Sequence, residues 1–270
     1  MKLTQRNYYG KKATRHYMSV SQIKSFMKCE AQAIAEIKGE YAPDRGRALI
    51  LGSYVDEHLT GTPKSMKNFI TENYSEIYQK NGKPYADIAQ ADTAIERIKE
   101  QPLMMKYLTG KHQKIMTGEI CGVPIKIKMD CYKEGEFISD LKYMASLRSP
   151  NMFQSMINYW GYDMQAAVYQ EIVYQNAGKR LPFIFVVATK EKPCHLEVGV
   201  INQYNMDEAL ELVKSNIVRY QQIKQGKIEA ERCEDYNCVY CATTKIITEP
   251  IDTDLFGMSK KQIKGLNGEV

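Results

Sequence analysis

Two kinds of hydrophobic periodicity divide the chain. Apolar side chains recur at helical spacing in five stretches, which predicts helices over about 19–38, 45–60, 86–100, 150–176 and 206–225. Ser19 or Ser21 can cap the first of these helices. From residue 115 the period changes to two, which predicts a pair of strands joined by a turn over 132–135. The short apolar segments 183–189 and 195–201 predict a buried strand and its partner.

The order of these elements predicts the fold class. Helices, then a strand meander, a helix and further strands are typical of a mixed α/β or α+β domain, with a mixed central β-sheet flanked by helices. The sequence contains no internal repeat, low-complexity tract or linker rich in Pro, Gly and Ser. We therefore expect a single domain over residues 1–270, with a basic N-terminal segment (about 1–18) and a Cys-rich C-terminal segment (about 228–270).

The two strands around Gly135 place charged side chains together. In a hairpin centred on Gly135, residues whose numbers sum to 270 lie opposite each other, so Asp130 faces Asp140 and Lys142 points to the same side. Opposed carboxylates repel each other, and a divalent cation such as Mg²⁺ or Mn²⁺ between them would remove that repulsion. The alternative is a solvated face of an edge hairpin, which the short D-x-K motif alone favours.

Composition narrows the class of protein. With 44% apolar and 26% charged residues, the chain is neither fibrous nor wholly disordered. The longest apolar run, Leu181 to Ala188, is well short of the roughly 18 residues of a membrane span. The opening residues are basic and rich in Tyr, unlike a signal peptide. We therefore expect a cytoplasmic protein with no membrane partner.

The net charge of +5 permits a polyanionic partner without requiring one, and the distribution of the charge is more informative than the total. Basic and aromatic residues alternate near the N-terminus: Lys2, Arg6, Tyr8, Tyr9, Lys11, Lys12, Arg15, His16 and Tyr17. This mixture suits phosphate contacts combined with base stacking. A solvated terminus is the alternative interpretation.

The seven cysteines fall into two groups. Cys121, Cys131 and Cys194 stand alone in apolar or strand-like settings, where a buried small hydrophobic residue is expected. A C-x4-C-x2-C cluster lies in a polar segment: Cys233, Cys238 and Cys241. Structural zinc and [4Fe–4S] sites usually have four thiolates, and Cys29 on the first predicted helix is the candidate fourth ligand. The alternative is that all four are ordinary reduced thiols.

Five short motifs in a fixed order resemble the PD-(D/E)XK nuclease superfamily. In chain order they are Leu51-Gly52-Ser53-Tyr54-Val55-Asp56, Gly118-Glu119, Asp130, Asp140-Leu141-Lys142, and Gln165 with Tyr169. The set is most similar to the phage and prophage exodeoxyribonuclease branch, which includes RecE (exonuclease VIII) and, more distantly, lambda exonuclease. The segments 7–9 and 17–22 also look like the opening of that branch, so the resemblance covers nearly the whole chain.

The resemblance implies roles for individual residues. The residues matched to catalysis are Asp130, Asp140, Lys142, Glu119, Gln165 and Tyr169. The implied ligands of Mg²⁺ or Mn²⁺ are Asp56, Glu119, Asp130, Asp140 and the backbone carbonyl of Leu141. Many relatives have a metal-binding His at the position of Asp56. His58 competes for that role but lies about 200° around the helix from Asp56, so one of the two faces the site.

The resemblance also implies an activity. It predicts a Mg²⁺-dependent 5′→3′ exonuclease on double-stranded DNA ends, making 3′ overhangs for a phage single-strand annealing protein. It further implies a ring-shaped homo-oligomer, a trimer or tetramer. Arg15 and Ser21 loosely match residues that hold the 5′-phosphate, although the sequence slightly favours a surface charge and a helix cap. The four cysteines resemble the iron–sulfur staple of AddB-type helicase-nucleases and small CRISPR-adaptation nucleases.

Two other functions remain open from the sequence. One is a nuclease of the CRISPR-adaptation or repair type that acts on single-stranded DNA. The other is a non-catalytic, metal-stapled DNA-binding module. The charged trio of Asp130, Asp140 and Lys142 argues against the module, because binding alone gives no reason to hold three charges together in a partly buried setting.

Overall fold

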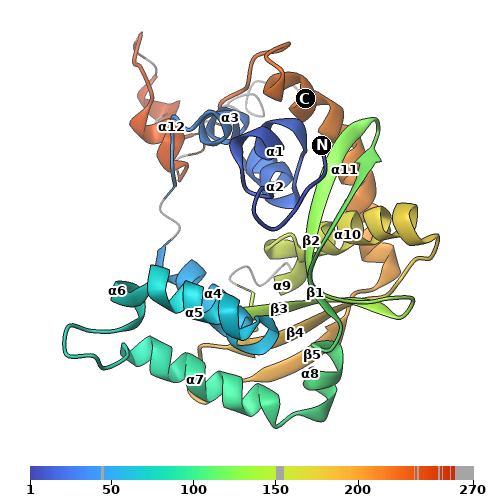
Figure 1. Cartoon of the computed structure of the whole chain (residues 1–270). Helices are drawn as coiled ribbons and strands as arrows, with labels where there is room; N and C mark the ends of the chain where they lie inside the picture. The colour runs from blue at the N-terminus through green and yellow to red at the C-terminus, as the bar shows by residue number, and fades with distance from the viewer. Residues whose placement is uncertain are drawn as a thin grey trace.

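The computed structural model describes residues 1–43, 46–149, 155–233, 235, 237–248, 250, 252–255 and 257–258. Within these residues one five-stranded sheet runs in the order β1-β2-β3-β4-β5 (Figure 1). Its strands are β1 (Lys111–Ile120), β2 (Val123–Lys133), β3 (Phe137–Met144), β4 (Phe183–Thr189) and β5 (Leu196–Val200). The β3–β4 pair is parallel and the other pairs are antiparallel. The predicted mixed sheet is confirmed.

The β2–β3 hairpin has the predicted register. Cys131 lies opposite Ser139 and Lys133 opposite Phe137, so paired residue numbers sum to 270. Gly135 lies in the turn with φ +74°, a conformation that glycine adopts without the Cβ clash of other residues. The ladder ends at the Cys131–Ser139 pair, and β3 continues alongside β4. The hairpin therefore opens at the residues that carry the predicted chemistry.

Helices cover both faces of the sheet (Figure 1). One apolar cluster packs α2 (Val20–Lys28), α10 (Tyr162–Ala177) and α11 (Gln203–Lys224) against one face. A second cluster packs α4 (Gly46–Thr60) and α7 (Ala86–Lys99) against the other face. Strand β4 lies between the two layers and is buried along its whole length, which explains its unbroken apolar sequence.

Shorter elements complete the described fold. They are α1 (Lys11–His16), α3 (Glu30–Lys38), α5 (Pro63–Glu72), α6 (Tyr74–Ile77), α8 (Pro102–Tyr107), α9 (Met156–Tyr159), α12 (Val239–Thr243) and a 3₁₀ turn (Thr253–Leu255). Most contain two turns or fewer, too few for a helical period to stand out in the sequence. No helix among the described residues is long and apolar enough to cross a membrane.

Three predicted helices are confirmed, and two are interrupted. The helices expected over 45–60, 86–100 and 206–225 correspond to α4, α7 and α11, although position 45 lies outside the described residues. The helix expected over 150–176 begins outside them too, and its described part is split into α9 and α10 at Gly161. Gly161 has φ +61°, which breaks the helical hydrogen-bond pattern and begins α10 afresh.

The helix expected over 19–38 is interrupted at Cys29. Ser19 caps α2 through a reciprocal capping box with Gln22, and α3 begins at Glu30. Cys29 between them is extended, with φ −162° and ψ 112°. The freed amide of Ala31 donates to the carbonyl of Glu231 at 3.0 Å, so the C-terminal segment compensates for the missing helical bond.

A close backbone approach at the start of β1 gives a stability prediction. A Cβ atom on Gly110 would lie 2.8 Å from both the carbonyl oxygen of Tyr132 and the sulfur of Cys131. The Gly110→Ala variant should therefore lose about 1–3 kcal/mol of unfolding free energy, measured by urea denaturation. Gly199→Ala is the control, because no atom lies within 4 Å of its added Cβ. Equal losses in both variants would contradict the role assigned to the close contact.

Candidate active site

Three carboxylates meet where the β2–β3 hairpin opens. Asp140 on β3 is 3% exposed, and its Oδ1 accepts a hydrogen bond from Gln165 Nε2 at 2.5 Å. Asp130 on β2 accepts a hydrogen bond at Oδ2 from the Leu141 amide at 3.1 Å. Asp56 on α4 interacts electrostatically with both of these carboxylates. The structure therefore brings residues from three elements to one place.

Lys142 neutralises part of this negative charge. Its Nζ forms an ion pair with Asp140 Oδ2 and lies 5.0 Å from the ring centre of Tyr162 and 5.8 Å from that of Phe185. Burial acts to lower the pKa of Lys142, but Asp140 and Asp130 together more than offset that effect and raise the pKa above its ordinary value. Lys142 is therefore an ammonium group held against a carboxylate and two aromatic rings.

Helix α10 supplies two further groups from adjacent turns. Gln165 and Tyr169 are four residues apart and so lie on one face of the helix. Gln165 bonds Asp140, and Tyr169 donates its hydroxyl to the carbonyl of Lys128 at 3.0 Å. Burial raises the pKa of Tyr169 well above its ordinary value, so this hydroxyl keeps its proton. The spacing in the sequence thus corresponds to one helix face directed at the open hairpin.

The structure separates Asp56 from its competitor His58. Asp56 accepts hydrogen bonds from Thr60 Oγ1 at 2.8 Å and from Gln113 Nε2 at 2.9 Å, on the side of the other carboxylates. Nδ1 of His58 instead lies 2.8 Å from the carbonyl of Tyr54, and the two rings pack with centres 4.1 Å apart. Of these two candidates, Asp56 faces Asp130 and Asp140.

The donor set fits a hard divalent cation. Burial, followed by repulsion from Asp140 and Asp56, raises the pKa of Asp130 well above its ordinary value. Burial also raises the pKa of Asp56. Among the described residues, Asp140 Oδ2 is a buried oxygen with no hydrogen-bond donor in suitable geometry, although Lys142 Nζ is close to it. Carboxylate oxygens are the ligands that Mg²⁺ and Mn²⁺ prefer.

Glu119 does not join this group, contrary to the sequence prediction. It lies opposite Pro124 beside the β1–β2 turn, whereas Asp130 is near the other end of the same hairpin. Its side chain is exposed, and its backbone bonds the side chain of Gln175 at 3.0 Å and 2.7 Å. Pro124 and Asp130 are six positions apart along β2, which corresponds to about 20 Å of strand and rules out shared coordination in this arrangement.

The predicted 5′-phosphate residues also lie apart from the carboxylates. Ser21 is exposed and contacts Ser19, which is the residue that caps α2. Arg15 is exposed on α1 and lines a hollow formed with α3 and the C-terminal end of α11, where none of the acidic site residues occurs. The structure therefore does not bring Arg15 and Asp140 together.

Two residues at the site had no signal in the sequence. Gln113 reaches Asp56 from a β1 position with φ +49°, a local distortion that periodicity does not reveal. Lys24 on α2 donates to the carbonyl of Trp160 at 3.0 Å and lies 5.2 Å from the ring centre of Tyr162. Burial and the nearby Lys142 lower the pKa of Lys24 to about 8. Two lysines thus approach the same tyrosine ring.

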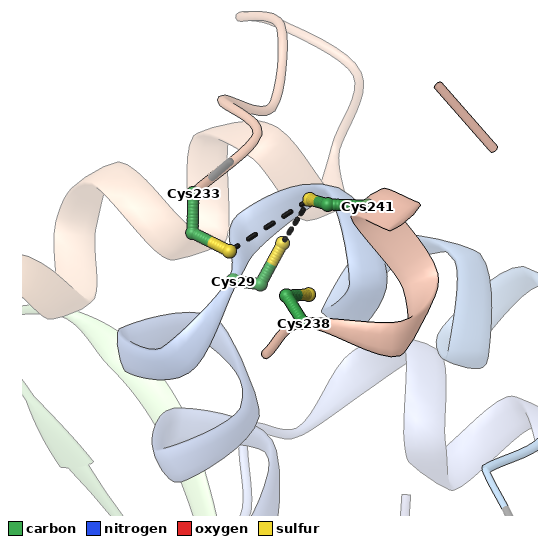
Figure 2. Close-up of side chains that lie close together, drawn as sticks. All are labelled: Cys29, Cys233, Cys238 and Cys241. Atoms are coloured by element: carbon green, nitrogen blue, oxygen red, sulfur yellow. Dashed lines mark hydrogen bonds between the residues drawn. The ribbon is translucent and has the colours of Figure 1, made fainter. Parts of the chain in front are cut away.

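The second predicted site brings four thiols together (Figure 2). Cys29, Cys233, Cys238 and Cys241 place their sulfur atoms within 4.8 Å of one another. Among the described residues, this is the one group of three or more metal-binding side chains that is so compact. The three site carboxylates are more widely spread. Burial acts to raise the pKa of Cys29, but hydrogen bonds from the backbone of Cys233 and Gln32 and from neighbouring thiols bring it below its ordinary value.

A group of ion pairs and hydrogen bonds, called the Arg219 clip below, holds the C-terminal segment beside these thiols. Arg219 on α11 donates to both carboxylate oxygens of Glu30, at 2.7 Å and 2.8 Å, and to Glu231 at 3.0 Å. The amide of Glu231 also donates to Glu30 at 2.8 Å. Since Glu30 follows Cys29 directly, the Arg219 clip fixes the N-terminal member of the cluster against the segment that carries the other three.

The isolated cysteines differ from one another. Cys131 and Cys194 are buried, as predicted. Cys121 is exposed in the tight β1–β2 turn with φ +49°, so the prediction of a buried residue was wrong there. Alternating strand residues on either side gave it an apolar setting in the sequence, but the turn carries it out of the sheet.

The fold and the group formed by Asp130, Asp140 and Lys142 define a PD-(D/E)XK nuclease-like domain. Residues 19–244 match the family described as a PDDEXK-like domain of unknown function (DUF3799), and the chain belongs to this family. Its structure is similar to the crystal structure of a "Putative exonuclease" from Eubacterium rectale, with a TM-score of 0.87 and 38% sequence identity, covering 96% of this chain and 99% of that chain. No curated protein matches the chain significantly.

Relief of carboxylate repulsion gives a stability prediction. A carboxyl group whose pKa is higher in the folded protein than in the unfolded chain destabilises the fold once the pH rises above its pKa in the unfolded chain, about 3.9. Without divalent cations, Asp130→Asn should therefore melt higher than the parent at pH 8, by roughly 2–4 °C for each kcal/mol relieved, and the difference should shrink at pH 4. Adding Mg²⁺ should raise the melting temperature of the parent more than that of the variant.

Asp207→Asn is the control, because Asp207 is an exposed carboxylate on α11. It should leave both the melting temperature and its response to Mg²⁺ unchanged. Identical melting curves for the parent and Asp130→Asn at pH 8 in EDTA would contradict the repulsion described here.

Proposed function

We propose that this protein is a metal-dependent exodeoxyribonuclease that hydrolyses phosphodiester bonds at DNA ends. The observation that carries the proposal is the convergence of Asp130, Asp140 and Lys142 at the opening of the hairpin, with Asp56 facing them. Such a group combines ligands for a hard cation with an ammonium next to the reaction centre, which phosphodiester hydrolysis requires. The description of the similar Eubacterium rectale structure as a "Putative exonuclease" supports the same reaction.

Each residue has a distinct task in this proposal. Asp56, Asp130 and Asp140, together with the backbone carbonyl of Leu141, would hold Mg²⁺ or Mn²⁺. The bound cation would neutralise charge on the phosphate and make a water molecule more acidic. Lys142 stabilises negative charge on the attacking oxygen or on the phosphate in the transition state. Gln165 orients Asp140 through its hydrogen bond and is a positioning residue.

The proposed substrate, direction of degradation and oligomeric state follow from the family resemblance. According to it, the enzyme degrades double-stranded ends in the 5′→3′ direction and leaves 3′ overhangs for a single-strand annealing protein of the phage type. The same resemblance gives a ring-shaped trimer or tetramer. The alternative is a nuclease of the CRISPR-adaptation or repair type, for which the four-thiol cluster is the favouring observation. Single-stranded and double-stranded substrates separate the two.

Substitutions at the carboxylates and the lysine test the reaction. Asp140→Ala and Lys142→Ala should each reduce hydrolysis of linear duplex DNA about a thousandfold or more, because each removes an interaction made in the transition state. Asp56→Ala should reduce it strongly, whereas the control His58→Ala should stay within about tenfold of the parent. Initial rates with Mg²⁺ provide the measurement, and circular dichroism verifies folding.

The substrates are chosen to separate the alternatives. Linear duplexes with a 5′-phosphate or a 5′-hydroxyl, single strands and covalently closed circles are compared under the same conditions. Preference for linear duplex over the circle supports an exonuclease, and preference for single strands supports the alternative. Near-parental activity in Asp140→Ala, or rapid cleavage of the circle, would refute the proposal.

We further propose that the four thiols hold either one Zn²⁺ or a [4Fe–4S] cluster. Their mutual distances support a metal, because four cysteine sulfur atoms at this spacing are the ligand set of a structural metal site. Cys29 and Cys241 are far apart in the sequence, so a shared metal would close a long loop and connect the C-terminal segment to α2 and α3. Metal-binding energy at such a site adds directly to folding stability.

Metal analysis of anaerobically purified protein tests this site. We expect either iron with sulfide and a broad absorbance near roughly 400 nm, or about one zinc per chain. Cys29→Ser should lower the metal content and the melting temperature together, and Cys194→Ser should change neither. If the preparation contains neither metal and all four thiols react freely in the folded protein, the proposed site does not exist.

A further inference from the structure

The N-terminal segment lies beside the active-site carboxylates. Gln5 Nε2 donates to the backbone carbonyl of Gln113 at 2.5 Å, and the side chain of Gln113 donates to Asp56 at 2.9 Å. Tyr8 is close enough to Tyr169 to influence its pKa. The hydrogen bond and the electrostatic interaction thus place residues 5–9 near Asp56 on α4 and near Tyr169 on α10.

The β2 strand continues from the active site toward this segment. Lys126, Lys128 and Asp130 alternate along β2 and therefore point to one face of the strand. Lys126 donates from Nζ to the carbonyl of Tyr8 at 2.6 Å. Lys128 lies two residues, or about 7 Å, from Asp130 and also interacts with Asp56. A positively charged group thus flanks the carboxylates on the side of the two tyrosines.

Tyr8 and Tyr9 have different surroundings. Tyr8 is 6% exposed, with Lys126 Nζ 4.6 Å from its ring centre. Tyr9 packs edge-on against Tyr8 with ring centres 5.0 Å apart, and Lys128 Nζ lies 4.7 Å from its own centre. Even so, 73% of Tyr9 is exposed. One ring anchors the segment, while the other is supported at its edge and open to solvent.

We propose that Tyr9 is a stacking platform for a nucleobase of the bound DNA strand, with Lys128 contacting the phosphate next to the one that is hydrolysed. A planar ring held in place on one side and bare on the other matches what an unpaired base requires, and an adjacent ammonium matches its phosphate. The platform rests on the proposed function, and it adds that the end nucleotide is unstacked from the duplex before hydrolysis.

Binding to a hydrolysis-deficient protein tests the platform. In an Asp140→Asn background, a DNA end carrying 2-aminopurine at its terminal base is titrated with protein, and affinity and fluorescence are recorded. Tyr9→Ala should weaken binding about 5- to 100-fold and abolish the fluorescence change caused by stacking. Tyr9→Trp should retain both. Lys128→Gln should reduce the slope of log affinity against log salt by about one.

Tyr204→Ala is the matched control. Tyr204 is 65% exposed on α11, and its hydroxyl bonds Glu208 rather than a lysine. It should bind as the parent does. Parental affinity in Tyr9→Ala would overturn the platform, and so would weak binding by Tyr9→Trp with an unchanged melting temperature. The failure of the platform can be distinguished from the failure of the proposed function. If binding depends on Tyr9 but the parent does not hydrolyse DNA, only the nuclease activity is contradicted. If Tyr9→Ala hydrolyses DNA as fast as the parent at low substrate concentration, only the platform is contradicted.

Discussion

Repulsion between the carboxylates at the mouth of the β2–β3 hairpin is the constraint around which the site is built. The ladder ends at the Cys131–Ser139 pair, and beyond it the Leu141 amide bonds the Asp130 carboxylate. The surrounding groups supply positive charge or hydrogen-bond donors: Lys142 and Gln165 for Asp140, and Gln113 and Thr60 for Asp56. These contacts do not cancel the effects of burial and repulsion, since burial, followed by repulsion from Asp140 and Asp56, still raises the pKa of Asp130. A divalent cation would complete the compensation.

The four-thiol site and the carboxylates are connected through one helix. Cys29 terminates α2, and Lys24 one turn earlier bonds the carbonyl of Trp160 and approaches the ring of Tyr162. The same ring lies beside Lys142. A metal at the thiols would fix the C-terminal end of α2 and, through it, the position of Lys24. A metal there would therefore act on the active site through the placement of a helix and not through direct chemistry.

Local patterns in the sequence predicted the catalytic geometry well, because an antiparallel hairpin needs only alternation and a turn to fix which residues face each other. The register around Gly135 follows in this way as far as the Cys131–Ser139 pair, and Asp130 and Asp140 lie just beyond the end of that ladder. The position of Glu119 could not follow, because motif order does not reveal how far along a strand a residue lies. Cys29 shows a second limit, because helical periodicity runs through it. The amide of Ala31 that is freed by the interruption donates to the carbonyl of Glu231, about 200 residues away, and the local pattern does not reveal this partner.

The proposed catalytic residues and the proposed DNA-stacking residue lie in different parts of the chain. The carboxylates and Lys142 lie within residues 19–244, which match the family, whereas Tyr9 lies before them. The N-terminal segment contacts the rest of the domain through two hydrogen bonds. Gln5 donates to Gln113, and Lys126 donates to the carbonyl of Tyr8. Gln113 in turn bonds Asp56, so the order of this carboxylate and the order of the N-terminal segment depend on each other. A DNA strand that stacks on Tyr9 would hold the N-terminal segment in place. The hydrogen bond from Gln113 would then keep Asp56 directed at the proposed cation site.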